Sequence, residues 1–453
     1  MTLPSSQGLI ADFVIGNVVI TSEMRQLARD ALFDTLAVSF AGAREAVSLQ
    51  TLDYVRQSGG RGDAPFWTFS DTGAAEQAAL LNGVVAHALD YDDVSPSWRG
   101  HGSAVMFPAI TAVGRNHSID NILDAYVVGF EVGARLGRAV IATHYPRGWH
   151  ATATIGIIAA TAAVCRLVGA KREVIENGLG LAVAQAAGVQ ANFGTTAKPL
   201  HAGFAAMGAV RALALAQAGI ASSSAAIDGR TGFAGLYAEN PDIASKFTDV
   251  GTLPFAITAA KLERKHYPMC YAAHRAVAAV MRLHAKHTID AGNVASISVE
   301  SSKGSHDPLL DRLPNSPDEA KFSLEFNVAA AMIDRAISLN TFTDAALTRD
   351  DIRSLAMRTT IKELKSDSGV RWSRVSLKFK DGSELAETAE RLDSQSGFET
   401  DPVFRAKIAD CLKAAGTSMD PRLLYGALTH GSRPVASLFE LDDVRQLRTR
   451  LTI

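Results

Sequence analysis

Two long stretches rich in alanine and glycine place the strongest limit on what this 453-residue chain can fold into. One ends just before Asn192, and the other runs from Gly203 to Gln217. Residues 151–170 are long enough to span a bilayer, but they contain Arg166 and are followed by more sequence of the same kind. We therefore expect buried helices that are surrounded by other helices.

The segment between these stretches, Asn192–Gly203, carries one lysine, one histidine and two hydroxyls. Pro199 suits the first turn of a helix, because its missing N–H would have no helical partner there. Lys198 is then expected at the helix entrance, beside free backbone N–H groups and the positive end of the helix dipole. Such a place binds anions such as carboxylates. The alternative is a solvated lysine on a loop.

Composition narrows the function classes. Hydrophobic residues make up 47% of the chain and charged residues 20%, as in an ordinary soluble enzyme. A formal net charge of −2 gives no reason to expect nucleic acid or a membrane as a partner. The three widely spaced cysteines, Cys165, Cys270 and Cys411, do not suggest a disulfide framework or a metal cluster. The first residues lack the features of a signal peptide, so we expect a cytoplasmic protein.

Apolar spacing and capping residues predict mostly helices. Helices are expected over residues 22–42, from about 74 to 87, from Pro108 onward, and over 120–141, 150–168, 171–190, 318–338, 404–415 and 421–451. Ala295, Ile297 and Val299 alternate with polar residues, as in a half-buried strand. Another alternating run ends at Asp381-Gly382, a hairpin turn signal. The sequence therefore predicts a large all-helical domain, residues 1–267 and 401–453, and a smaller α+β domain, residues 268–400.

Chemistry-bearing side chains gather in two loops. The helix that ends near His87 is followed by Asp90, Asp92 and Asp93, which would oppose the dipole at a helix C-terminus and repel one another. Stability alone would not select this cluster, so a local function is expected. A second loop, Thr143–His150, contains a phenol, a guanidinium and two imidazoles.

These motifs together resemble the MmgE/PrpD family. The matching stretches are His87–Asp93 with His101, Gly148–His150, Gly194–Gly203, Lys265–His274 and Ala320–Leu324. The resemblance implies a helical domain built from both chain ends, an α+β domain between them, a homodimer and an active site in the interdomain cleft. It also implies chemistry next to a carboxylate of a small polycarboxylate, such as 2-methylcitrate dehydration, cis-aconitate decarboxylation or iminodisuccinate epimerisation.

The resemblance carries active-site roles over to five positions: Asp90, His101, His150, Lys198 and Lys265. Two positions depart from the pattern of the dehydratases and decarboxylases. Val94 stands in place of a threonine, and Phe326 in place of a tyrosine. Both changes remove hydroxyls, whereas His266 adds an imidazole beside Lys265.

We therefore predict a cofactor-independent epimerase that inverts an α-carbon of an amino polycarboxylate such as iminodisuccinate. Lys198 and Lys265 would stabilise the charge that develops on the carboxylate. Arg99 and Arg147 would bind other carboxylates. Asp90, His101 and His150 are expected in the substrate-binding site, where the two histidines would bind the substrate or handle a proton; the alternative is that they are core residues that orient Asp90. His266 and Tyr145 would exchange the proton on opposite faces of the carbon.

Several alternatives remain open at this stage. A 2-methylcitrate-type dehydratase, a cis-aconitate-type decarboxylase and a non-catalytic helical scaffold are the competing functions. Cys270 could replace one base, although a small buried residue is the commoner role. A divalent metal could bind His87, Asp90, Asp92 and Asp93, with Asp90 and Asp93 on the helical face of His87, but we expect no metal. We expect His87, His144 and His201 either to be structural or to support residues that contact the substrate.

Overall fold

The computed structural model describes residues 4–260, 262–365, 371–390, 392 and 396–452. The chain divides into two compact units, each of which is described by itself. The first contains Met1–Ala191, Ala197–Arg264 and Gly397–Ile453. The second contains Lys265–Ser396 and a short segment, Asn192–Thr196, that directly precedes a helix of the first unit.

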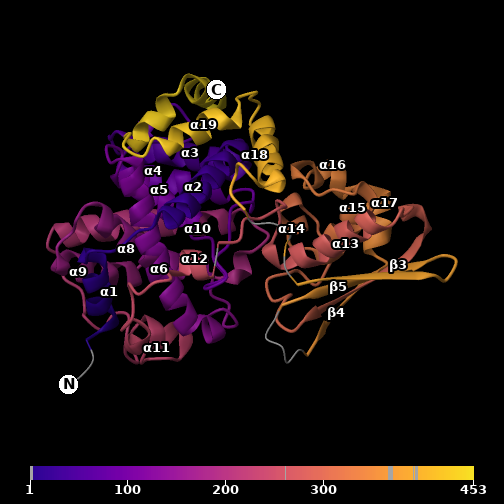
Figure 1. Cartoon of the computed structure of the whole chain (residues 1–453), viewed down its shortest axis with the longest axis horizontal. Helices are drawn as coiled ribbons and strands as arrows, with labels where there is room; N and C mark the ends of the chain where they lie inside the picture. Colours follow the sequence, from indigo (N-terminus) through magenta and orange to yellow (C-terminus); the bar gives the residue numbers. More distant parts are fainter. Residues whose placement is uncertain (1–3, 261, 366–370, 391, 393–395, 453) are drawn as a thin grey trace. The chain divides into compact units, whose positions relative to one another are not determined.

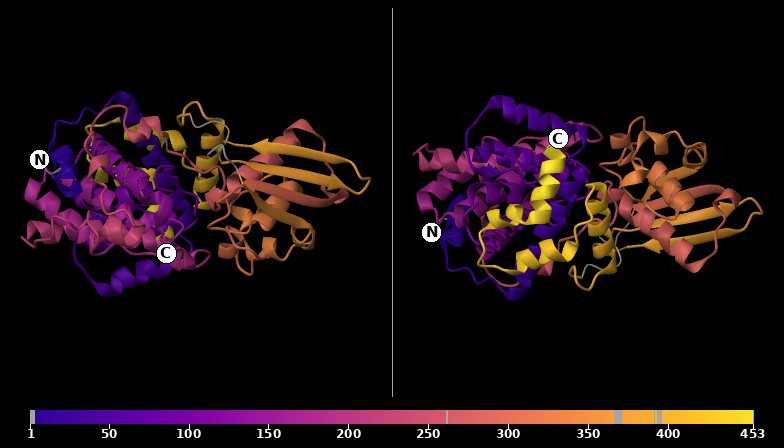
Figure 2. Two further views of the ribbon diagram at one scale, coloured as in Figure 1. Left: turned by 90° about the horizontal axis from the view of Figure 1, so that it is seen from below. Right: turned by 90° about the horizontal axis from the view of Figure 1, so that it is seen from above.

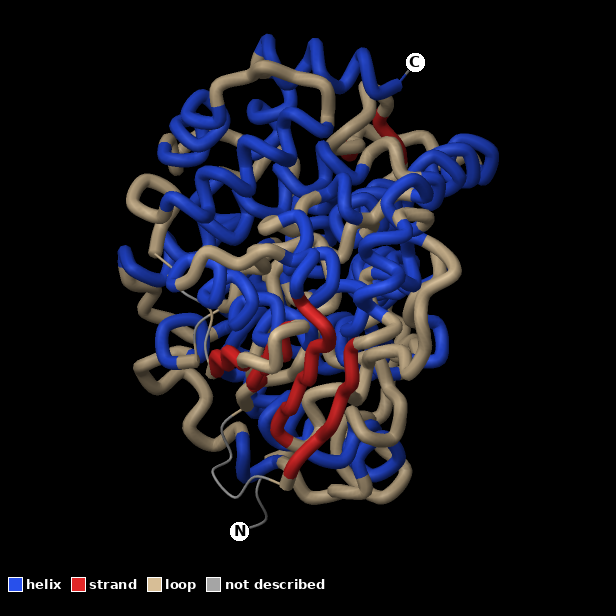
Figure 3. Tube along the Cα trace, turned by 90° about the vertical axis from the view of Figure 1, so that its right-hand side faces the viewer, coloured by secondary structure: helices blue, strands red, loops and turns tan. Residues whose placement is uncertain are grey.

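The first unit is almost entirely helical (Figure 3). Its helices before residue 264 are α1 (Ser6–Ile15), α2 (Ser22–Gly42), α3 (Ala46–Ser58), α4 (Ala75–His87), α5 (Ser103–Val113), α6 (Ile119–His144), α7 (Ala151–Thr154), α8 (Gly156–Leu167), α9 (Arg172–Val183), α10 (Ala197–Gln217), α11 (Phe233–Ala238) and α12 (Ala256–Ala259). Two short strands, β1 (Ala64–Pro65) and β2 (Thr72–Gly73), pair antiparallel between α3 and α4. The C-terminal segment adds α18 (Pro402–Ala414), α19 (Pro421–Thr429) and α20 (Asp442–Thr452).

Local signals located several helices correctly. Thr21 caps α2 by accepting a hydrogen bond from the Met24 N–H, as its hydroxyl predicts. Lys198 is the second residue of α10, and Gly219 follows the helix with a φ of +89°. A left-handed residue just after a helix is the usual place for glycine.

Other predicted boundaries are wrong because distant contacts override local spacing. Pro108 lies inside α5, which starts earlier at Ser103, where the side chain donates a hydrogen bond to Asp93. The predicted helix over 171–190 stops at Val183, because Val189 pairs in an extended conformation with Trp149. The predicted helix over 150–168 is divided into α7 and α8. The predicted helix over 318–338 becomes two separate helices, and Ser323 caps the second of them.

Helix α10 lies at the centre of this unit and packs against α4, α5, α8 and α9. Among the described residues it is the one helix that is long and apolar enough to cross a membrane by length and composition, and 67% of its apolar window is buried inside the protein. The C-terminal helix α18 packs on α2, so both ends of the chain help to form the unit (Figure 2).

The second unit is a four-stranded sheet with helices on one face (Figure 1). The strand order is β4 (Thr359–Leu364), β3 (Val294–Ser302), β5 (Ser373–Phe379) and β6 (Glu384–Ala389). The β3–β4 pair is parallel, and the β3–β5 and β5–β6 pairs are antiparallel. The helices are α13 (His274–Lys286), α14 (Pro317–Ala320), α15 (Leu324–Asp334), α16 (Asp344–Leu347) and α17 (Asp350–Ala356).

The core of this unit lies between the sheet and helices α13, α15 and α17. Ile297, Val299, Val375 and Leu377 are buried in that core, and the β5–β6 hairpin turns at Gly382 with a φ of +89°. The alternation predicted for both strands is confirmed, except that Ala295 lies at a register shift and is only partly buried. The predicted fold class, mainly helical with a smaller α+β part, is also confirmed.

Candidate active site

The packing of α4 against α10 brings His87 and Lys198 together. The two helices meet where both lack a side chain: a Cβ added to Gly83 would lie 2.8 Å from the Gly203 Cα, and one added to Gly203 would lie 2.5 Å from the Leu80 carbonyl oxygen. This close approach requires glycine on both helices. Because α4 leads toward His87 and α10 begins beside Lys198, antiparallel packing places these side chains at the same end of the pair.

Lys198 is held in a buried network of polar side chains. Its ammonium donates a hydrogen bond to Asp90 Oδ1 at 2.8 Å, and its Nζ lies 2.9 Å from His87 Nε2. The side chain is only 6% exposed. The helix-entrance position predicted for Lys198 is confirmed, and the solvated-lysine alternative is wrong.

Asp90 lies in a turn after α4, not on the helix. Its φ is +52°, in the left-handed region, and its N–H donates to the His87 carbonyl oxygen. The predicted helical face shared by His87, Asp90 and Asp93 is therefore wrong. A left-handed non-glycine residue costs on the order of 1 kcal/mol or more and persists only where its surroundings fix it. Here the ion pair with Lys198 and the burial of the side chain supply that constraint.

His101 lies between two carboxylates. Its Nδ1 is 3.0 Å from Asp92 Oδ2, and its Nε2 is 3.6 Å from Asp90 Oδ1. Asp92 also lies 2.8 Å from His87 Nδ1. Burial acts to raise the pKa of Asp92, but the two neighbouring imidazoles outweigh burial and hold that pKa well below its ordinary value. Asp92 is therefore a carboxylate.

Asp93 belongs to a different buried group. It accepts a hydrogen bond from the Ser103 hydroxyl at 2.5 Å, and that hydroxyl also lies 2.7 Å from the Tyr126 hydroxyl. Burial raises the pKa of Asp93 well above its ordinary value. Asp93 therefore does not belong with His87, Asp90 and Asp92, as the metal site considered from the sequence would require.

A different set of four side chains has the donor chemistry of a cation site. One ligand atom from each of His87, Asp90, Asp92 and His101 lies within 4.8 Å of the others. Lys198 Nζ lies at hydrogen-bond distance from two of these side chains, at His87 Nε2 and Asp90 Oδ1. The lysine ammonium therefore already supplies a positive charge beside His87 and Asp90.

His150 extends the cluster, and its imidazole ring lies 6.1 Å from that of His87 and 6.5 Å from that of His101. His150 Nδ1 is 2.9 Å from His201 Nδ1. Burial, followed by nearby positive charge, lowers the pKa of His150 well below its ordinary value, and burial lowers the pKa of His201 to about 4. Both rings are therefore neutral near pH 7, and one donates to the other.

Tyr145 contacts Arg99, whereas Arg147 is paired with an acidic residue. Tyr145 follows the last residue of α6 and is 7% exposed, and the Arg99 guanidinium carbon lies 5.1 Å from the centre of its ring. Arg147 forms an ion pair with Glu239, a partner that the sequence did not indicate. Arg147 would have to exchange Glu239 for a substrate carboxylate in order to play the predicted role.

Lys265 and His266 fall in the second unit and are described within it. Lys265 is fully buried, whereas His266 is partly exposed, with its ring 6.2 Å from that of Tyr267. Cys270 is buried, and its N–H donates to the Lys321 carbonyl oxygen. Phe326 is a member of the hydrophobic core of this unit.

Two buried side chains, Trp98 and Lys407, hold the loop between Asp90 and His101 in place. Trp98 lies against α6, where a Cβ on Gly133 or on Gly137 would overlap its side chain. Lys407 of α18 donates hydrogen bonds to Asp34 and to the carbonyl oxygen of Tyr91, which belongs to this loop. The C-terminal segment thus contributes to the position of the acidic residues.

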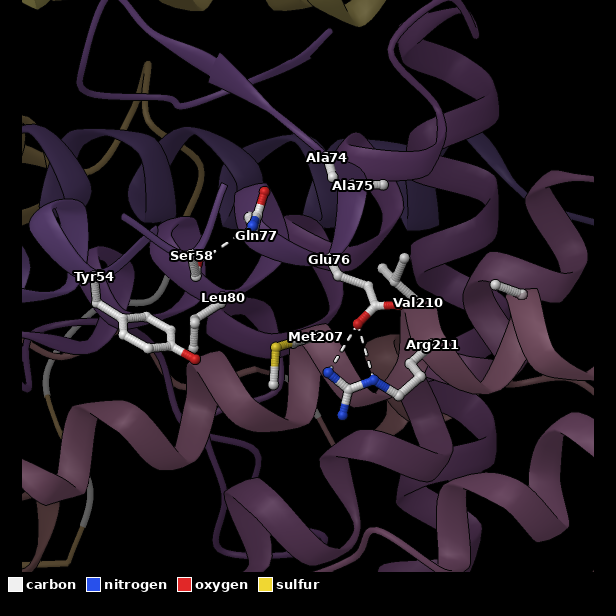
Figure 4. A pocket seen from close by; sticks show the side chains of 11 residues that line it. Tyr54, Ser58, Ala74, Ala75, Glu76, Gln77, Leu80, Met207, Val210 and Arg211 are labelled. Atoms are coloured by element: carbon white, nitrogen blue, oxygen red, sulfur yellow. Dashed lines mark hydrogen bonds and ion pairs between the residues drawn. The ribbon is translucent and has the colours of Figure 1, made fainter. Parts of the chain in front are cut away.

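A separate surface groove lies at the other end of the α4–α10 pair (Figure 4). It has a volume of about 420 Å³, and Glu76 and Arg211 pair across it at 2.8 Å. Tyr54, Leu80 and Met207 give it apolar walls. None of the predicted site residues lines this groove.

Comparisons with known proteins agree with this architecture. Residues 9–246 match the MmgE/PrpD N-terminal domain, and residues 267–420 match the MmgE/PrpD C-terminal domain. The chain is 24% identical to cis-aconitate decarboxylase from Homo sapiens over 95% of this chain and 91% of that protein. It is also 24% identical to the cis-aconitate decarboxylases of Mus musculus, over 88% of this chain and 84% of that protein, and of Aspergillus terreus, over 82% and 81%. Because the first match alone spans more than half of the sequence, the chain belongs to the MmgE/PrpD family.

Proposed function

We propose that this protein is an enzyme that moves a proton on the carbon next to a carboxylate of a small polycarboxylate. The observation that supports it most is the buried ammonium of Lys198, placed at the start of α10 and fixed by Asp90 and His87. A fixed cation at a helix N-terminus stabilises negative charge with little reorganisation. Relatives that are named for cis-aconitate, a polycarboxylate, support the substrate class.

The proposed reaction is epimerisation of an amino polycarboxylate such as iminodisuccinate. A base removes the proton from the α-carbon, and the C–H electron pair moves into the adjacent carboxylate to give an enediolate. Lys198 stabilises the added charge on oxygen. An acid on the opposite face then returns a proton to the carbon as the carboxylate re-forms, so that only the configuration changes.

We assign the two proton-transfer roles to Tyr145 and His266. An imidazole titrates near ~6.5 when unperturbed and can accept or donate a proton at neutral pH. A phenol titrates near ~10 and serves best as the donor. The proposal requires these two side chains to face opposite sides of one substrate carbon, and it gives Lys265 the role of a second cation.

We prefer epimerisation to decarboxylation or dehydration because this chain lacks two hydroxyl groups. Val94 and Phe326 carry no hydroxyl where the dehydratase and decarboxylase pattern has one, and both are buried. Decarboxylation of cis-aconitate now becomes the second candidate, ahead of the 2-methylcitrate-type dehydration that ranked second from the sequence, since cis-aconitate decarboxylases align with most of this chain.

A parallel assay separates the candidates. The purified protein is incubated in D₂O with iminodisuccinate, cis-aconitate or 2-methylcitrate, and each mixture is followed by NMR. The proposal predicts deuterium at Cα and loss of configuration with iminodisuccinate, without release of CO₂ or water. CO₂ release from cis-aconitate, or a new C=C bond in 2-methylcitrate, would replace it with the corresponding lyase.

The residue assignments have their own test. Tyr145→Phe and His266→Gln should each abolish epimerisation while leaving the unfolding temperature close to that of the wild type. Near-normal turnover in either variant would reject that residue as an essential acid or base.

A further inference from the structure

His87 is fully buried beside Lys198, and both of its ring nitrogens have partners. Nδ1 lies 2.8 Å from Asp92 Oδ1, and Nε2 lies 2.9 Å from Lys198 Nζ. The His87 and Asp92 side chains are 0% exposed. From the sequence, His87 was expected either to be structural or to support a residue that contacts the substrate, with no partner named.

The hydrogen-bonding rules of the three groups permit only one arrangement of protons. The carboxylate of Asp92 can only accept a hydrogen bond, so the hydrogen of His87 must be on Nδ1. The ammonium of Lys198 can only donate, so His87 Nε2 must carry the lone pair that accepts from it. Burial, opposed by Asp92 and reinforced by Lys198 and His101, lowers the pKa of His87 to about 3, which keeps the ring neutral.

We propose that Asp92 and His87 are positioning residues that fix the Lys198 ammonium by holding His87 in its Nδ1–H tautomer. Asp92 selects the tautomer, the tautomer presents a lone pair to Lys198, and Asp90 takes a second N–H of the same ammonium. Two of the three N–H bonds of Lys198 then point in fixed directions. The Nε2–H tautomer of His87 would direct an N–H group at the ammonium of Lys198 and repel it.

This inference rests on the proposed role of Lys198 in binding charge, but it can be tested without a substrate. In protein labelled with ¹⁵N-histidine, the ring ¹⁵N shifts distinguish the Nδ1–H tautomer, the Nε2–H tautomer and the imidazolium. The signals of His87 are assigned by their loss in His87→Gln. We expect the Nδ1–H tautomer at pH 7 in the wild type, whereas in Asp92→Asn the amide can also donate to Nδ1, so a substantial Nε2–H population should appear.

The position of Lys198 is followed in the same way with ¹⁵N-lysine. A buried, hydrogen-bonded ammonium gives a ¹H–¹⁵N cross-peak, which is assigned by its loss in Lys198→Arg. We expect this cross-peak to broaden in His87→Leu, which removes the acceptor. In His87→Gln, whose amide oxygen can still accept, the Lys198 cross-peak should be retained.

Activity adds a separate readout. With iminodisuccinate, His87→Leu and Asp92→Asn should lower kcat by about 100-fold with a much smaller change in KM, because a misplaced cation chiefly loses stabilisation of the transition state. His87→Gln should recover part of the kcat lost in His87→Leu. If no variant, nor the wild type, turns over iminodisuccinate while the tautomer and cross-peak results hold, the proposed function fails and the positioning role stands.

Three results would overturn the positioning role. The first is an Nε2–H tautomer or an imidazolium at His87 in the wild type. The second is a Lys198 cross-peak that is unchanged in His87→Leu. The third is selective broadening of the His87 signals by equimolar Mn²⁺, which would put a metal ion where the ammonium is expected.

Discussion

Burial decides what several histidines of the helical unit can do. His87, His144 and His201 all have lowered pKa values, and burial is the largest cause for each of them. A neutral imidazole can accept a hydrogen bond from a lysine or a hydroxyl, which an imidazolium cannot. At the scale of single residues, the site therefore depends on keeping these rings uncharged.

His144 offers a measurement of this effect away from the lysine cluster. Its pKa is lowered to about 4 by burial and by Arg147, and its Nε2 lies 2.9 Å from the Thr154 hydroxyl. In the unfolded chain a histidine titrates near ~6.5. The unfolded chain therefore binds more protons than the folded protein between pH 6.5 and about 4, and stability should fall as the pH falls through this window.

Urea unfolding at pH 7.0 and pH 5.0 measures that loss. His144→Gln should lose less stability than the wild type on acidification, by about 1.4 kcal/mol for each pH unit inside the window. The control is His287→Gln, at an exposed position. Parallel pH dependence in the wild type and His144→Gln would show that this ring is not buried as a neutral group.

Residue roles were only partly predictable from the sequence. Lys198 was located because proline and apolar spacing mark a helix start locally. The two partners of His87 were not predicted, since one lies five residues away and the other lies on α10, 111 residues away. A histidine next to an acidic cluster was the only available signal.

At the scale of helices, glycine determines how closely α4 and α10 approach. Gly203→Ala would place a Cβ 2.5 Å from the Leu80 carbonyl oxygen and 2.7 Å from a Val84 methyl group, so the helices must separate. We expect a loss of about 1–3 kcal/mol in unfolding free energy, as for other overpacked interiors. Activity should also fall, because Lys198 moves with α10.

Gly178→Ala in α9 is the matched control. Its Cβ would meet its nearest atoms at 3.5 Å or more, which is ordinary contact. Alanine also favours a helix over glycine by up to about 1 kcal/mol, so this variant should be as stable as the wild type or slightly more stable. Urea unfolding measures the stability of both variants. Equal losses of unfolding free energy at the two positions would contradict the close approach at Gly203.

Helix centres were predictable from apolar spacing, whereas several ends were not. After α9 ends, Val189 forms a bridge with Trp149, and the first residue of α5, Ser103, forms a hydrogen bond with Asp93. Both contacts join residues that are separated along the chain, so no local pattern contains them.

At the scale of the whole chain, the C-terminal segment is part of the helical unit. The Lys407 ammonium lies 2.7 Å from Asp34 Oδ1 and 2.7 Å from the Tyr91 carbonyl oxygen, which joins α18 to α2 and to the loop after Asp90. Burial raises the pKa of Asp34, and Lys407 opposes that shift. Neither partner is stable in the interior without the other.

Replacing Lys407 alone should therefore greatly lower the unfolding free energy. Lys407→Met leaves the Asp34 carboxylate buried without its cation and should cost about 3–5 kcal/mol, measured by urea unfolding. The double variant Asp34→Leu/Lys407→Met should recover most of that stability. Its activity should stay low, because the Tyr91 carbonyl oxygen has still lost its donor. A single variant as stable as the wild type would contradict this account.

The central claim of the proposed function is that one group removes a proton from the α-carbon and a second group, on the opposite face, returns one. It is tested most directly by following a single stereoisomer of iminodisuccinate in D₂O at low conversion. The account predicts deuterium at the inverted carbon of the product and almost none in the remaining substrate, because the returning proton comes from a solvent-exchanged group on the other face. Equal deuteration of substrate and product, or product formation with loss of CO₂ or water and no deuterium at Cα, would contradict it.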